Sequence, residues 1–164
     1  MAEEKAKAAD KRLAIIKIYL KDFSFESPLS PSVFRADEWK PQMNLNLRSV
    51  HAKVDNDYHE VILTITIEAK DKESDKTLFL VELHQAGLFE ISGYSGEELA
   101  ALTGSFCPNI LFPYAREAVA SAIQRGGFPE FVLQPINFDA LFMQQVQAQK
   151  LEAEKQAAAQ AEKH

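Results

Sequence analysis

Four histidines and one cysteine are the residues best suited to catalysis or metal binding in this sequence. A catalytic nucleophile needs a base beside it, and a zinc ion needs three or four His, Cys or carboxylate ligands. No metal-ligand spacing relates the five candidates to one another: His51, His59, His84, His164 and Cys107. We therefore expect no catalytic centre, no metal site and no cofactor.

Three smaller features of the sequence could also form sites. His51 and His59 flank a predicted hairpin and could face each other across it, although two surface histidines are the favoured interpretation. Cys107 has the setting of a small buried side chain. The segment Gly93–Gly96 is typical of a turn that enters a helix, because a phosphate-binding loop would need more glycines and a following Lys-Ser or Lys-Thr. The alternative is an enzyme that uses an apolar groove as the active site for a small ligand.

Composition excludes several classes of protein. The chain has 164 residues, 46% of them apolar, which suits one globular domain. Its net charge of -6 argues against nucleic-acid binding, which requires clustered Lys and Arg. The single cysteine allows no internal disulfide, and residues 1–12 have no signal-peptide pattern, so we expect a cytoplasmic protein. The densest apolar run, Val61–Ile67, is too short to span a membrane.

Alternating apolar and polar residues predict four antiparallel strands in the first two thirds of the chain. The strands are expected at 13–26, 43–48, 61–68 and 77–89. In the first of them, Ile18 and Leu20 share one parity, whereas Phe23 and Phe25 share the other. Because successive side chains point to opposite faces of a sheet, this switch predicts a bulge near Lys21.

Helices are predicted after the strands. Ser95 and Glu98 have the spacing of a capping box, and Gly104 is expected to end that first helix. A longer helix is predicted over Asn109–Arg125, with Gly126-Gly127 at its end, and a last helix near Phe138 with Asn137 as its cap. The predicted fold class is α+β, a four-stranded antiparallel sheet followed by a long helix and a C-terminal helix.

The two ends differ from this central domain. Both are rich in Ala, Gln, Glu and Lys and lack aromatic residues. Such segments can be helical but have no sustained apolar face to pack against a core, so the C-terminal one is expected to be a solvated helix that fades into disorder, with a coiled coil as the alternative. We therefore expect a disordered N-terminal extension at 1–12, a folded domain at 13–149, and a polar flexible tail at 150–164.

Aromatic residues also occur where regular structure is not expected. Phe34 and Trp39 lie in a Pro-rich connection between the first two strands, and Phe138 and Phe142 lie at the start of the last helix. They could simply cap the core. Alternatively, they could line a groove between the loop and the helix, where adaptable side chains bind varied sequences.

Acidic residues are concentrated in the middle of the chain. Between Asp55 and Glu98 there are eleven Asp or Glu residues and three Lys. A solvated, solubilising face is one interpretation. A docking surface for a basic partner is the other.

Three stretches resemble the signature of SecB, the bacterial protein-export chaperone family. They are Tyr19–Glu26 (YLKDFSFE), Cys107–Glu117 (CPNILFPYARE) and Pro135–Phe142 (PINFDALF). The stretches are long, specific and in the family's order, and the resemblance covers about residues 16–149. It implies a homotetramer, built as a dimer of dimers, that binds unfolded precursor proteins without ATP and delivers them to the SecA motor.

The resemblance also implies roles for individual residues. It implies a SecA-binding surface at Asp22, Glu26, Leu80 and Glu82. It implies subunit-pairing positions at Val81, Leu83 and Gln85, with the helix Asn109–Arg125 between dimers. Client contacts are implied at Phe34, Trp39, Phe138, Leu141 and Phe142. The alternative function is that of a SecB-like chaperone dedicated to one client, such as an antitoxin, because the same grooves would serve it.

Overall fold

A computed structural model describes residues 10–162 of the chain. Its centre is one antiparallel sheet of four long strands in the order β1-β4-β3-β2. The strands are β1 (Arg12–Glu26), β2 (Pro41–Asp55), β3 (Tyr58–Asp71) and β4 (Thr77–Ser92). The sheet confirms the four predicted strands, and β1 and β2 form its two edges.

Three helical segments follow the sheet in one continuous run. They are α1 (Gly96–Ala101), the π-helical turn η2 (Leu102–Phe106) and α2 (Cys107–Arg125). The prediction that Gly104 ends the first helix is wrong, because the backbone stays helical through η2 into α2. Ser95 occupies the N-cap position of α1, but its side chain makes no capping hydrogen bond.

The end of α2 and the start of the last helix follow local sequence signals. Gly127 adopts a positive φ of 87°, which glycine tolerates without strain, directly after α2. The last helix, α3 (Phe138–Ala161), begins at the predicted place, where the backbone N–H of Ala140 donates to Asn137 Oδ1 at 3.0 Å. Both predicted boundaries are confirmed.

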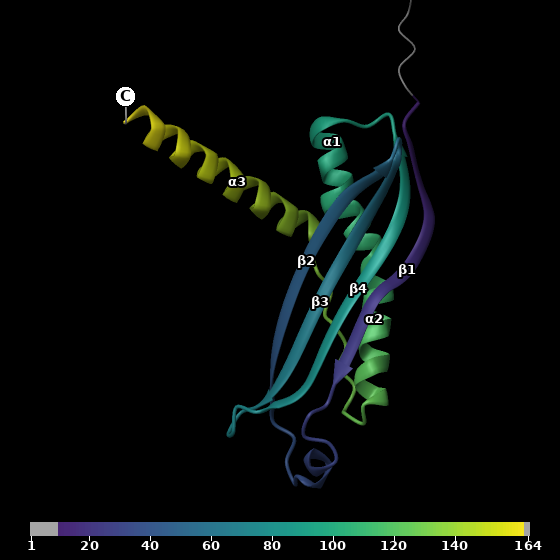
Figure 1. Ribbon diagram of the computed structural model, residues 1–164, viewed down its shortest axis with the longest axis vertical. Coiled ribbons are helices and arrows are strands. Elements are labelled where there is room, and N and C mark those ends of the chain that lie inside the picture. Colours follow the sequence, from purple (N-terminus) through teal and green to yellow (C-terminus); the bar gives the residue numbers. More distant parts are fainter. Residues whose placement is uncertain (1–9, 163–164) are drawn as a thin grey trace, which may run out of the picture.

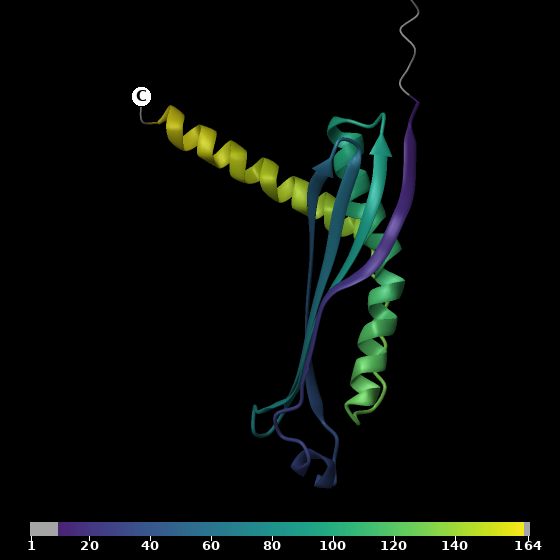
Figure 2. The same ribbon diagram turned by 45° about the vertical axis from the view of Figure 1, so that its right-hand side comes forward.

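The helices are distributed unequally around the sheet. α2 packs against β3 and β4 on one face, whereas the other face carries no helix within residues 10–162 (Figures 1 and 2). α3 projects away from the body beyond the β2 edge (Figure 1). The helix continues past residue 150, where a polar tail was expected to begin. Most of the expected N-terminal extension, residues 1–9, lies outside the described residues.

The core lies between the sheet and α2. Val61, Leu63, Ile65 and Ile67 of β3 are fully buried there, as the strict alternation of that strand requires. Between Leu20 and Asp22 the register of β1 against β4 shifts by one residue. This shift confirms the predicted bulge. None of the helices within residues 10–162 has the length and apolarity that crossing a bilayer requires.

Candidate functional site

Phe34 and Trp39, which we call the loop cluster, lie on the connection between β1 and β2. Phe34 belongs to a short 3₁₀ helix, η1 (Ser32–Arg35). Each ring packs against Phe128, with centroids 5.5 Å apart in both pairs. Phe34 nevertheless remains 51% exposed and Trp39 39% exposed. The cluster therefore presents aromatic surface to solvent from a fixed position.

Phe128 provides the support beneath the loop cluster. Its ring is 5% exposed and lies 4.9 Å from that of Phe79 in the core. A Cβ at the neighbouring Gly127 would meet the Phe34 ring at 3.0 Å, so the close approach of loop and segment requires a glycine there. Phe128 was not predicted as a functional residue. The signal available was an apolar run, FPEFVL, in a segment without a regular pattern.

Phe138, Leu141 and Phe142, the helix cluster, occupy the first two turns of α3. Phe138 is buried and packs edge-on against Phe112, with ring centroids 5.6 Å apart. Leu141 is exposed and Phe142 is half-buried. The structure thus divides the predicted client contacts: Phe138 anchors the helix, and Leu141 and Phe142 offer accessible surface.

The two clusters lie near opposite ends of α2. The loop cluster rests on Phe128, just after the end of α2, whereas Phe138 contacts Phe112 in its second turn. A helix of 19 residues is about 28 Å long at 1.5 Å per residue. The segment 126–137 runs back along this length and contributes buried Phe128 and Leu133. The two clusters therefore do not form one pocket. They lie at the two ends of a surface track, which we define as the segment 126–137 where it runs along α2.

A hollow of about 570 Å³ opens beside the loop cluster, between the loop and the β3–β4 hairpin. Its apolar lining includes Leu29, Val33, Trp39 and Leu78. Its charged lining consists of Asp37, Glu38, Asp71 and Glu73, together with Lys40, which forms an ion pair with Glu38. Apolar lining with acidic groups around it favours an apolar segment that carries positive charge.

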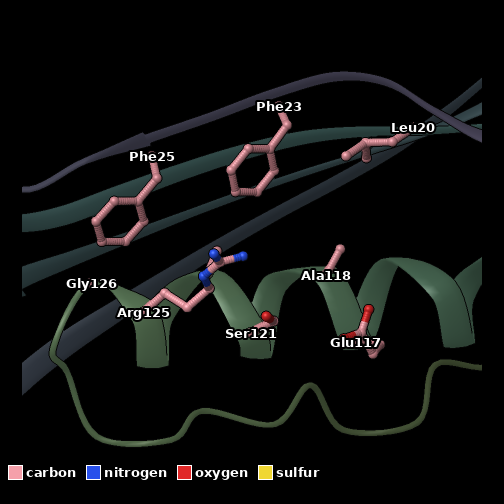
Figure 3. Close-up of a pocket in the computed structure, with 9 residues that line it drawn as sticks. Leu20, Phe23, Phe25, Glu117, Ala118, Ser121, Arg125 and Gly126 are labelled. Atoms are coloured by element: carbon pink, nitrogen blue, oxygen red, sulfur yellow. The ribbon is translucent and has the colours of Figure 1, made fainter.

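A second hollow, of about 490 Å³, separates β1 from α2. Leu20, Phe23 and Phe25 of β1 point into it across the bulge, toward Ala118 and Ser121 of α2 (Figure 3). Phe23 is 39% exposed. An edge strand with exposed apolar side chains is a typical site for pairing with another chain.

The four predicted SecA-binding residues come together on the helix-free face of the sheet. In the register of β1 and β4, Asp22 lies opposite His84 and Glu26 lies opposite Leu80. Glu82, between them on β4, accepts a hydrogen bond through Oε1 from His84 Nε2, and the two atoms are 3.0 Å apart. We call these four residues the acidic surface.

The three predicted subunit-pairing residues lie inside a single chain. Val81 and Leu83 are 0% exposed and Gln85 is 5% exposed. Gln85 Nε2 donates to the backbone oxygen of Tyr19 at 3.1 Å. Because β4 lies between β1 and β3, both of its edges are already paired. A second subunit could therefore not contact these residues directly, but only the elements that pack on them.

Cys107, His51 and His59, which were considered for catalysis, are held by burial or by a hydrogen bond within the sheet and helices. Burial raises the pKa of Cys107 to about 12, so its thiol stays protonated at neutral pH. His51 Nε2 and His59 Nδ1 lie 2.7 Å apart and share one hydrogen bond across the β2–β3 hairpin. His59 is 4% exposed, which corrects the interpretation of two surface histidines. Within residues 10–162, no three His, Cys, Asp or Glu side chains converge as a metal site would need.

Comparisons with known proteins decide the family. Residues 6–149 match the family described as "Preprotein translocase subunit SecB". The chain belongs to the SecB family. SecB from Nitrosococcus oceani is 53% identical over 137 residues, which are 83% of this chain and 82% of the relative. SecB from Hahella chejuensis is 50% identical over 151 residues, 92% of each chain. Both relatives are named protein-export proteins, which confirms the predicted family and its export-chaperone function.

A solved structure shares the fold of this SecB protein. It is a SecB-like chaperone from Mycobacterium tuberculosis, solved in complex with a peptide from an antitoxin. The two superpose with a TM-score of 0.62 at 18% sequence identity, covering 76% of this chain and 91% of the other. This likeness supports the α+β architecture of sheet and helices.

Proposed function

We propose that this SecB protein holds unfolded precursor polypeptides without ATP and delivers them to SecA for export. The observation that carries the proposal is the loop cluster, in which Phe34 and Trp39 stay half-exposed while Phe128 fixes them from below. Aromatic side chains on a rigid support bind apolar segments with little loss of their own conformational entropy. Folded proteins bury such segments, so the site selects unfolded chains.

The spacing of the two clusters suggests the length of a client segment. An extended chain covers at most about 3.3–3.6 Å per residue. From Phe112, which the helix cluster contacts, to the end of α2 is roughly 20 Å, so a segment that spans the two clusters would contain about six residues. The acidic groups around the hollow near Trp39 add a preference for Lys or Arg in that segment.

We propose the acidic surface as the docking site for SecA. Asp22, Glu26 and Glu82 lie close together on a sheet face that no helix covers within the described chain. This face is opposite to the α2 side, where the loop cluster rests on Phe128, so a client and a basic segment of SecA could bind at the same time. Simultaneous binding is what a transfer from chaperone to motor requires.

We propose a homotetramer, a dimer of dimers, as the working form. β1 is a free edge with exposed apolar side chains, among them Ile15 and Phe23. α2 lies beside it and exposes Tyr114. Pairing through β1 and α2 would place Val81 and Leu83 one layer below the interface. Four linked sites would gain effective concentration for a long client, and solution mass near four times 18.4 kDa is the expected result.

The remaining assignments are part of the same proposal. The protein acts in the cytoplasm as a binding protein and not as an enzyme. A chaperone dedicated to one client is the second candidate, because the structural neighbour was solved with an antitoxin peptide. Relatives about half identical to this chain carry the export name, which favours the general export role.

A direct experiment mixes the purified protein with a chemically unfolded precursor and, separately, with the same precursor after folding. We expect binding of the unfolded form alone, without nucleotide, and suppression of its aggregation at one tetramer per client. Equal affinity for the folded form, or no suppression at any ratio, would contradict the proposal. A panel of unrelated unfolded clients separates the two candidates, since a dedicated chaperone would bind one of them only.

A further inference from the structure

The orientation of α3 depends on a small joint at its first two turns. Phe138 is the buried residue of the helix, and every side chain from residue 150 to 162 is exposed. η2 is the element against which α3 makes its main contacts. Figures 1 and 2 show the rest of the helix extending away from the sheet. Contacts at the root therefore set the direction of the whole helix.

Gly104, in the middle of η2, forms a socket for Phe142. A Cβ built on Gly104 would lie 2.6 Å from Phe142 Cδ2 and 2.7 Å from Cε2. Both distances are far below the 3.5–4.0 Å of a favourable carbon contact. The ring therefore occupies the space that any side chain at this position would need. Gly104 has a helical backbone, so its own conformation gives no other reason for a glycine.

The neighbouring residue of η2 holds α3 by a polar contact. Ser105, which is buried, donates a hydrogen bond from its hydroxyl to Asp139 Oδ1. Asp139 and Phe142 are three positions apart on α3 and therefore lie on the same face of the helix. Two consecutive residues of a π-helical turn thus contact one face of α3. Single π-turns inside α-helices are frequent at functional sites.

We propose that Gly104 is a positioning residue, which seats Phe142 and thereby fixes where α3 presents Leu141 to a client. The seating of Phe142 against Gly104 concerns this chain alone and does not depend on a client. The consequence for client affinity rests on the proposed chaperone function. A side chain larger than hydrogen at this position lifts the Phe142 ring and turns the helix cluster away from the track along α2.

Gly104→Ala tests the joint, because packing and helix propensity predict opposite results. Alanine favours a helix over glycine. If Phe142 did not pack against Gly104, backbone hydrogen exchange at the start of α3 should therefore be unchanged or slower in Gly104→Ala. Overpacking of the Phe142 ring should instead open the root of α3, and deuterium uptake over residues 138–150 should become roughly tenfold faster. Uptake over β3 should stay unchanged, which shows that the body remains folded. Client affinity should fall by about tenfold.

A rescue variant makes the test specific to the socket. In the Gly104→Ala background, Phe142→Leu should slow the uptake again, because the branched leucine can turn its methyl groups away from the new Cβ. Met143→Leu is the matched control, since Met143 is 55% exposed on the same turn, and it should give no rescue. Ser105→Ala removes the polar contact without adding atoms and should also speed the uptake over 138–150.

Several outcomes would overturn the proposal. They are unchanged or slower uptake in Gly104→Ala, equal rescue by Phe142→Leu and Met143→Leu, or faster uptake with unaltered client affinity. If Gly104→Ala unfolds the body, unaltered uptake in Ser105→Ala would overturn it as well. Failure of the unmutated protein to bind any client would refute the proposed function instead, because hydrogen exchange needs no client.

Discussion

Phe34→Ala separates client binding from stability. The ring is 51% exposed and contacts Phe128 at 5.5 Å between centroids. Full burial of a phenylalanine contributes about 1.5–3 kcal/mol, and an aromatic pair about 0.5–1.5 kcal/mol more. Losing half of the burial and one pair should therefore cost roughly 1–3 kcal/mol of unfolding free energy, which leaves the protein folded. As an aromatic anchor for clients, Phe34 should contribute about 2 kcal/mol, or roughly thirtyfold in Kd.

Trp39 supplies the assay, because it is the only tryptophan in the chain and lies beside Phe34 on the same support. Binding of a tryptophan-free unfolded client should shift its emission to shorter wavelength, as apolar client surface covers the indole. The titration gives Kd directly in both proteins. Val54→Ala is the matched control, since Val54 is 61% exposed but lies at the far end of β2. A Kd within twofold of the unmutated value in Phe34→Ala, or an equal loss in Val54→Ala, would show that Phe34 is not a client anchor.

Three further predictions concern the other surfaces. Glu82→Lys reverses a charge in the acidic surface and should weaken SecA binding at least tenfold while client affinity stays unchanged; equal loss of both in calorimetry would show that the surface is assigned wrongly. Burial lowers the pKa of His51 and His59, so the unfolded chain binds protons more readily and stability should decrease as the pH falls below about 6.5. Urea unfolding at pH 7.5 and 5.5 should show this decrease, and His59→Gln should reduce it. Gly127→Ala should destabilise the protein by about 1–3 kcal/mol and weaken clients, because φ of 87° and the Phe34 ring both oppose a Cβ; a melting temperature like that of the unmutated protein would contradict this.

Features that depend on neighbours in sequence were predictable. The bulge at Lys21 follows from a switch of parity within one strand, and a parity switch needs no knowledge of the partner strand. Asn137 and Gly127 mark helix ends through their own backbone and side-chain geometry. Each of these signals acts within a few residues, where periodicity and capping rules apply.

Features that depend on distant contacts were not predictable from pattern. Gly104 has the sequence signal of a helix stop, but the ring of Phe142, 38 positions further on, gives the glycine a packing role inside a continuous helical run. Phe128 supports the loop cluster from a segment with no regular period. Alternation identified the buried face of β4 but not its central place in the sheet, where Val81 lies in the core of the single chain and both strand edges are paired.

We propose that this protein holds unfolded chains by direct binding, without energy from a nucleotide. The most direct measurement is the folding rate of a slowly folding precursor after dilution from denaturant, with increasing amounts of the purified protein and no ATP. Binding to the unfolded state removes it from the folding reaction by mass action. We predict that the observed rate falls in proportion to the free fraction of precursor and approaches zero at stoichiometric protein. A folding rate that is independent of the protein concentration would contradict the account.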